Sequence, residues 1–157
     1  NLIIRGCQMK DGHGGVTIGS EISGGVRNVF AEKCRMDSPN LDRALRIKTN
    51  SVRGGVIEQI HLRDIDVGQV AGAAIDVDFY YEEGEGGAFP PTVRDVTVER
   101  MRCRKSERAL HLRGYAASPI RGLRLTDCVF ENAAKPDRLD HVEQLTQHNV
   151  TVNGQKR

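Results

Sequence analysis

NLIIRGCQM at residues 1–9 is followed by NVFAEKCRM at residues 28–36, where apolar residues, Cys and Met recur after 27 residues. Related stretches begin at residues 59, 95, 122 and 149, at steps of 31, 36, 27 and 27. Between successive copies lies a second short stretch: VTI at 16–18, LRI at 45–47, IDV at 75–77 and LHL at 110–112. Two strand types that alternate at such a period are typical of the coils of a solenoid rather than the blades of a propeller.

A parallel β-helix explains this pattern, because stacked coils place equivalent residues in columns about 4.8 Å apart. One apolar column is expected to hold Cys7, Cys34, Ile65, Met101 and Cys128, buried inside the coils. A second inward column holds the apolar residues at positions 18, 47, 77 and 112. The sequence therefore predicts an all-β fold of about ten short parallel strands in roughly five coils, with the Gly- and Pro-containing stretch 82–91 as a loop.

Composition narrows the function classes. The chain has 157 residues and a formal net charge of +2, from 23 basic and 21 acidic residues. So small a net charge creates no strong electrostatic field that would attract nucleic acid. No apolar run approaches the ~18 residues of a membrane span. We predict one partial β-helix domain over residues 1–157, which begins directly with a strand and is expected to belong to a longer protein. Residues 136–147 are the one segment predicted as a short helix.

Three of the four cysteines, Cys7, Cys34 and Cys128, fall on the inward apolar column, which fits them better than a metal site. A free Cys on an inward column behaves as a small hydrophobic residue. Cys7 and Cys34 would lie on neighbouring coils, so a disulfide between them stays open as an alternative to buried thiols, although their Cβ vectors would be parallel. No C-x-x-C spacing exists, and we predict no metal and no cofactor.

Candidate ligand-binding residues lie on the opposite, outward side of the short strands. Arg46 and Lys48 flank the inward Ile47, so both cations point outward about 7 Å apart. Stacking extends them into two outward columns, Thr17–Arg46–Asp76–His111 and Gly19–Lys48–Asp78–Arg113. Such a pair of cations suits a ligand that carries carboxylates. The alternative is that Arg46 and Lys48 pair with Asp76 and Asp78 on the next coil.

Gly12-His13-Gly14 precedes this pair by 33 residues, at the equivalent place on the preceding coil. Together with the Gly19-Ser20-Glu21 extension and Arg46-Ile47-Lys48, this order resembles glycoside hydrolase family 28, the polygalacturonases and their relatives. The resemblance implies a right-handed parallel β-helix that hydrolyses α-1,4-galacturonide bonds of pectin with inversion. It also implies an acidic polysaccharide as the partner, with neither nucleic acid nor membrane, and a secreted or periplasmic location.

The resemblance assigns roles to matching positions only. His13 matches the catalytic histidine beside the family's acid pair, and Arg46 and Lys48 match the pair that binds the substrate carboxylate. A family tyrosine that follows the next coil corresponds by spacing to Tyr81, although strict strand alternation would turn Tyr80 outward instead.

The family's catalytic aspartates come from an Asn-Thr-Asp motif and an Asp-Asp pair, and neither occurs in this sequence. Asp76 and Asp78 share a face at ~7 Å, a separation that would suit an inverting pair, but both are expected to face cations. Two hypotheses follow: the C-terminal part of a pectin hydrolase that is inactive in isolation, or a non-catalytic β-solenoid that binds acidic polysaccharide through Arg46, Lys48 and Arg113.

Overall fold

The computed structural model describes residues 1–157 as strands, turns and loops. No helix capable of crossing a bilayer is present. The strands are β1 (Leu2–Arg5), β2 (Gln8–Met9), β3 (Val16–Ile18), β4 (Val26–Glu32), β5 (Arg35–Met36), β6 (Leu45–Lys48), β7 (Val56–Val67), β8 (Ala73–Asp78), β9 (Thr92–Cys103), β10 (Arg108–Arg113), β11 (Ile120–Thr126), β12 (Val129–Phe130), β13 (Arg138–Asp140), β14 (Val142–Glu143), β15 (Thr146–His148), β16 (Thr151–Val152) and β17 (Gln155–Lys156).

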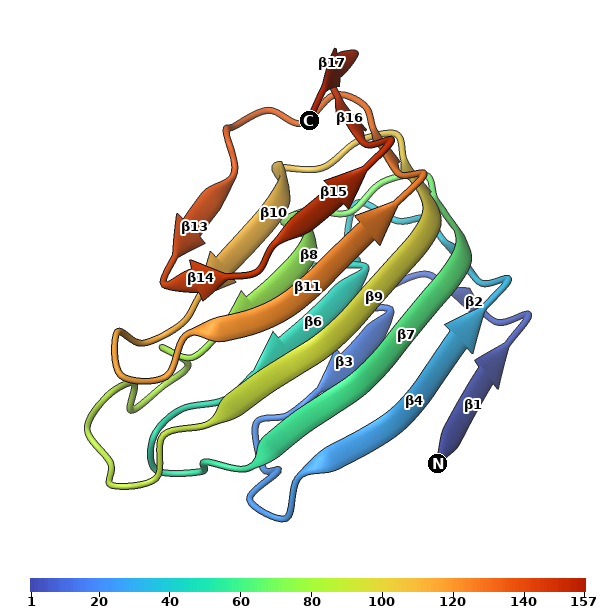
Figure 1. Ribbon diagram of the computed structural model, residues 1–157. Coiled ribbons are helices and arrows are strands. Elements are labelled where there is room, and N and C mark those ends of the chain that lie inside the picture. Colours follow the sequence, from blue (N-terminus) through green and yellow to red (C-terminus); the bar gives the residue numbers. More distant parts are fainter.

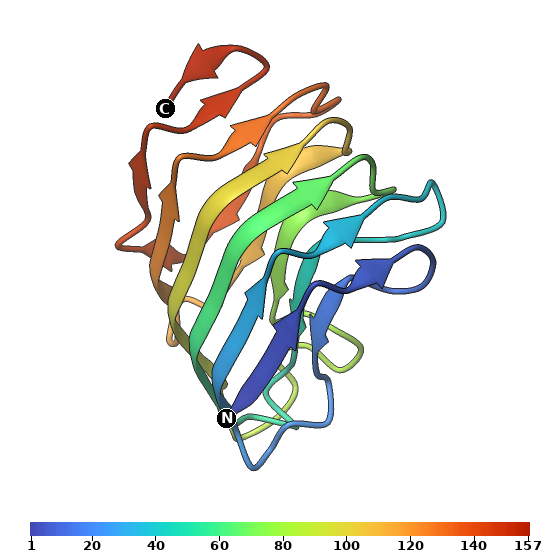
Figure 2. The same ribbon diagram turned by 90° about the vertical axis from the view of Figure 1, so that its right-hand side faces the viewer.

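These strands form two facing sheets, between which the chain passes back and forth (Figure 1). The smaller sheet has five strands in the order β13-β10-β8-β6-β3, and the larger has twelve. Strand pairs are parallel, except for the final pair of β16 with β17. Successive coils stack from the N-terminal to the C-terminal end (Figure 2), which makes a right-handed parallel β-helix. The predicted fold class is thus confirmed.

The register follows the sequence repeat through most of the chain. In the larger sheet, Val29 lies beside Leu2, Ile60 beside Val29, and Val96 beside Ile60. In the smaller sheet, all four predicted stretches pair in parallel, with aligned residues Val16, Leu45, Ile75 and Leu110. The strand count is higher than predicted, because the larger sheet also contains short strands such as β2, β5 and β12.

The last coil departs from the prediction. Residues 149–152 were expected beside 122–125, but Thr151 pairs with Val129, and Thr146 takes the place beside Arg124. The predicted helix at 136–147 is also wrong, because β13, β14 and β15 occupy this segment. The apolar residues at 139, 142 and 145 have a helix-like spacing, yet His141 and Gln144 have positive φ values and interrupt the segment between β13 and β14 and just before β15.

Inside the coils, one apolar core of 37 buried residues fills the space between the sheets. The predicted column of Cys34, Ile65, Met101 and Cys128 is buried, with each side chain at most 2% exposed. Cys7 is in register with this column but exposed, so its predicted burial is wrong: its coil is covered by a neighbouring coil on one side only. All four cysteines are free thiols, which excludes the Cys7–Cys34 disulfide from this structure.

Candidate active site

The outer face of the five-stranded sheet carries the two predicted columns. In the first, Arg46 lies beside Thr17 and Asp76, and Asp76 lies beside His111. In the second, Asp78 lies between Lys48 and Arg113. The alternate residues Ile47, Val77 and Leu112 are fully buried in the core, so the strands point these polar side chains away from it.

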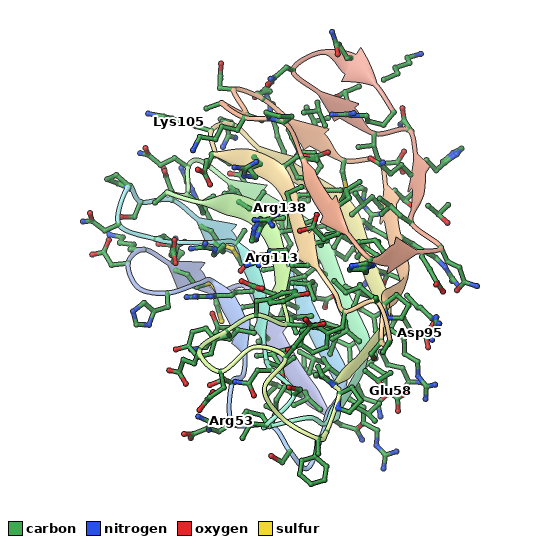
Figure 3. The ribbon with its side chains drawn as sticks, turned by 90° about the vertical axis from the view of Figure 1, so that its left-hand side faces the viewer. Arg53, Glu58, Asp95, Lys105, Arg113 and Arg138 are labelled. Atoms are coloured by element: carbon green, nitrogen blue, oxygen red, sulfur yellow. The ribbon has the colours of Figure 1, made fainter.

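The same columns continue onto a strand that the sequence did not reveal, β13. Arg138 follows His111, and Asp140 follows Arg113. Figure 3 shows Arg113 and Arg138 next to each other on this face, with Arg53 lower in the view. Asp140 joins them, because its carboxylate lies 2.7 Å from Nε of Arg138 and 3.8 Å from Nε of Arg113.

Arg46 is held on several sides, and its side chain is only 15% exposed. Its Nη1 donates a hydrogen bond to the backbone carbonyl of His13 at 3.3 Å and another to Oδ2 of Asp42 at 3.4 Å. Its Nε lies 3.9 Å from Oδ2 of Asp76. The predicted alternative, an Arg46–Asp76 pair, is therefore present, but it leaves part of the guanidinium fork without a partner.

Lys48 behaves differently, since it forms no ion pair with Asp78. The Asp78 carboxylate instead accepts a hydrogen bond from the backbone N–H of Tyr80 and pairs with Arg113 at 3.5 Å. The Lys48 ammonium lies 4.4 Å from the centroid of the Tyr81 ring, a cation–π contact. Lys48 is thus a cation whose charge no carboxylate of the chain neutralises directly.

His13 lies on the exposed loop just before β3. Its backbone is joined to Arg46 by the hydrogen bond described above, so the histidine and the arginine meet at the edge of the sheet. Gly14 permits this contact, because a Cβ at that position would lie 2.3 Å from Oγ1 of Thr17 and 3.3 Å from Cβ of Arg46. The sequence Gly12-His13-Gly14 therefore has a steric reason for its second glycine.

The two tyrosines at the end of β8 have different surroundings. Tyr80 packs edge-on against Tyr115, with ring centroids 5.0 Å apart, and Arg113 lies over its ring. Burial raises the pKa of the Tyr80 phenol. Tyr81 faces Lys48 instead. Strict alternation stops applying here because β8 ends at Asp78, before either tyrosine.

Beyond Lys48 and Tyr81 the surface is hollowed to a volume of about 470 Å³. The lining residues are Gly19, Ser20, Glu21, Ile22, Lys48, Arg53, Tyr81 and Glu82. Neither His13 nor Arg46 lines this hollow, so the predicted site residues form two adjoining groups, His13 with Arg46 and Lys48 with Tyr81.

Arg53 also lines this hollow, although the sequence pattern assigned it no role. Its guanidinium lies 3.2 Å from Glu21, 3.4 Å from Glu82 and 3.9 Å from Glu83. It therefore ties the loop after β3 to the loop after β8, on either side of Lys48. The only signal in the sequence was the position of Arg53 just before the glycines of the loop between β6 and β7.

The model of glycosyl hydrolases family 28 matches residues 1–151. The chain belongs to this family. Its polygalacturonase-like fold follows from that membership and from the structural match described next.

A probable polygalacturonase of Vitis vinifera is 25% identical over 127 residues, which cover 79% of this chain and 26% of the relative. The crystal structure of a hyperthermoactive exopolygalacturonase from Thermotoga maritima superposes with a TM-score of 0.92 at 34% identity. That match covers 99% of this chain and 34% of the other. The chain thus spans about a quarter to a third of the length of these family members.

Within this family fold, Asp76 and Asp78 are poorly suited to serve as the acids of a glycosidase. The Asp76 side chain is 3% exposed and faces Arg43, Arg46 and His111. The Asp78 carboxylate forms an ion pair with Arg113 and accepts a hydrogen bond from the backbone N–H of Tyr80. A general acid must reach the leaving oxygen of the substrate, and the contacts just described already occupy both carboxylates.

Proposed function

We propose that this chain supplies the carboxylate-binding part of the active site of a polygalacturonase-type hydrolase that degrades pectin. Arg46 and Lys48 bind the carboxylate of a galacturonate residue next to the scissile bond. One observation carries this proposal. Arg46 is oriented by Asp42 and Asp76, and it shares an outward sheet face with Lys48, whose ammonium has no carboxylate partner. A partly satisfied fork beside a free ammonium suits a carboxylate ligand.

The proposed reaction is hydrolysis of α-1,4-galacturonide bonds with inversion. One carboxylic acid protonates the leaving oxygen, and a carboxylate across roughly 6.5–9.5 Å activates the attacking water. In the family these acids come from motifs that residues 1–157 do not contain. His13 is proposed to lie beside them and support their protonation state, and Tyr81 to contact the sugar next to Lys48. No cofactor takes part.

A second candidate is a non-catalytic β-solenoid that holds acidic polysaccharide. The pairing of Asp76 and Asp78 with arginines on this face favours it. It would use the same cations, together with Arg113. Either way the partner is pectin or polygalacturonate, and since pectin is a cell-wall polymer, we propose a secreted or periplasmic location for the protein.

Calorimetric titration tests the shared element of both candidates. The chain is titrated with trigalacturonate and with its fully methyl-esterified form, which has the same sugar ring but no carboxylate. We expect the acid form to bind at least about tenfold more tightly, the scale of one charge-assisted hydrogen bond. Equal affinities would contradict carboxylate recognition.

Activity separates the two candidates. A protein that contains residues 1–157 together with the segment that precedes them in its gene is assayed for reducing ends released from polygalacturonate. Turnover that is abolished by His13→Ala supports the hydrolase. Binding without turnover by that longer protein supports the binding module.

A further inference from the structure

We infer that Asp76 is a positioning residue, which fixes the guanidinium of Arg46 so that its free edge faces the substrate carboxylate. The inference rests on the proposed function, because it assigns the orientation of the residue that would bind the substrate. It concerns a carboxylate that the proposed chemistry does not itself use.

Asp76 is unusual in this protein because it is the only charged residue among the 50 buried ones. Leaving a charge without partners in such a place would cost several kcal/mol, so neighbouring cations must compensate it. Its Oδ1 lies 2.5 Å from Nδ1 of His111, and its Oδ2 lies 3.3 Å from Nε of Arg43. The same Oδ2 lies 3.9 Å from Nε of Arg46.

The atoms involved determine what Asp76 does to Arg46. It faces Nε, the edge of the guanidinium nearest the backbone, while the His13 carbonyl and Asp42 accept from Nη1. Nη2 takes part in none of these contacts. Nε is buried and makes no hydrogen bond, so Asp76 acts on it as an ion-pair partner across 3.9 Å, while Nη1 makes the two hydrogen bonds. A guanidinium oriented in this way loses less entropy when a ligand carboxylate binds its remaining edge.

His111 in turn fixes Asp76. Its Nδ1 donates to Oδ1, which turns Oδ2 toward the two arginines. His111 and Asp76 are adjacent in register on β10 and β8, so rigid strands hold this geometry. The network runs from His111 through Asp76 to Arg46 along one column of the sheet.

A competing interpretation predicts the opposite result. If Asp76 only lowers the positive potential around Arg46, then its neutralisation makes the face more cationic and tightens binding of a polyanion. If Asp76 positions Arg46, then Asp76→Asn weakens binding of trigalacturonate by about tenfold, the effect of losing one well-oriented charge-assisted contact. The methyl ester, which lacks the carboxylate, changes less than twofold.

Asp140→Asn is the matched control. It removes one negative charge from the same sheet face, where Asp140 pairs with Arg113 and Arg138 and has no contact with Arg46. We expect its trigalacturonate affinity to stay within twofold of the wild-type value or to increase. Tighter binding by Asp76→Asn, or equal weakening of acid and ester, would overturn the inference.

If Asp76→Asn fails to fold, two variants of His111 test the same positioning role of Asp76. His111→Asn keeps an N–H donor near the position of Nδ1, whereas His111→Leu has none. We expect weaker trigalacturonate binding for His111→Leu by about threefold and near wild-type binding for His111→Asn. Identical affinities for the two variants would count against the network.

A spectroscopic readout separates this inference from the proposed function. The side-chain Nε–Hε signal of Arg46, assigned by its loss in Arg46→Lys, is expected to be well dispersed in the wild-type chain without ligand. It should move toward the position of a free arginine in Asp76→Asn and His111→Leu but not in Asp140→Asn. An unchanged signal refutes positioning by Asp76, whereas failure of the wild-type chain to bind trigalacturonate refutes only the proposed function.

Discussion

The ammonium of Lys48 lies 4.4 Å above the ring of Tyr81, although the two residues belong to different coils. The contact holds a flexible lysine at the border of the hollow without neutralising it, because an aromatic face attracts a cation but carries no net charge. An acidic partner at the same place would instead compete with a substrate carboxylate. The pair is therefore suited to present a positive charge in a fixed position.

Replacement of Tyr81 tests this relationship. Tyr81→Leu removes the ring face, and we expect trigalacturonate to bind more weakly by about 1 kcal/mol, since Lys48 loses its fixed position. Tyr81→Phe keeps the ring and should retain most of the affinity. Calorimetry on both variants makes the comparison, and a loss as large in Tyr81→Phe as in Tyr81→Leu would show that the hydroxyl, not the ring, matters.

The cations themselves give the second prediction. Arg46→Ala and Lys48→Ala should each weaken trigalacturonate binding by ~1–3 kcal/mol, the range of a charge-assisted hydrogen bond. The methyl-esterified oligomer should be hardly affected, because its carboxylate is gone. If both ligands lose the same affinity, the two cations have a structural role instead.

A third prediction concerns the backbone beside Lys48. Gly19 has a φ of +104°, and a Cβ there would lie 1.9 Å from the carbonyl oxygen of Lys48. Gly19→Ala should therefore lower the free energy of unfolding by at least ~2 kcal/mol, because backbone atoms must move. Gly24 has open space around it and an ordinary φ, so Gly24→Ala should change stability by less than about 1 kcal/mol. Urea denaturation measures both, and equal stabilities would contradict the steric argument.

Thiol reactivity gives a fourth prediction. Cys7 is exposed, whereas Cys34, Cys103 and Cys128 are buried. Burial raises the pKa of Cys103 to about 11 and raises that of Cys128 as well. Since the thiolate is the reactive form, Ellman's reagent at about pH 8 should modify one thiol rapidly and the other three only after denaturation. Rapid reaction of more than one thiol in the native protein would show that the reagent reaches the buried cysteines.

The raised pKa of Cys103 gives the fourth prediction a second test, in the pH dependence of the free energy of unfolding. The folded state keeps its Cys103 proton up to a pH of about 11, whereas an unfolded thiol loses it near pH ~8.5. The unfolded state therefore binds fewer protons between these values, and the free energy of unfolding should fall as the pH rises through that window. Cys103→Ala should show a smaller decrease over the same range in denaturation measurements.

Much of the fold could be predicted because columns of a β-helix repeat the same inward and outward alternation. The order Val16, Leu45, Ile75 and Leu110 is visible as short apolar alternations at regular steps, and the structure pairs these residues in that order. Regular steps fail in the last coil, where β15 lies only 22 residues after its partner in β11. A shortened coil with few apolar residues carries little periodic signal.

The site was predictable only in part, for a related reason. Outward alternation identified Arg46, Lys48 and Asp76 as neighbours, but it could not tell that Asp76 is covered by Arg43, which comes from the loop before β6. Arg53 likewise acts through side chains of two other loops. Contacts between loops depend on their three-dimensional course, which no local pattern encodes.

The fifth prediction is that a polypeptide of these 157 residues releases no reducing ends from polygalacturonate. The acids on the sheet face of Arg46 and Lys48 are Asp76, which is buried among cations, and Asp78 and Asp140, which both pair with Arg113. Contacts with cations already occupy these carboxylates, so none of them is placed to reach a leaving oxygen, and His13 alone cannot supply both acid and base. A longer family member serves as the positive control in a reducing-end assay. Turnover by the 157-residue chain near the rate of that control would contradict the prediction, and its loss in Asp76→Asn or Asp78→Asn would then identify the acid.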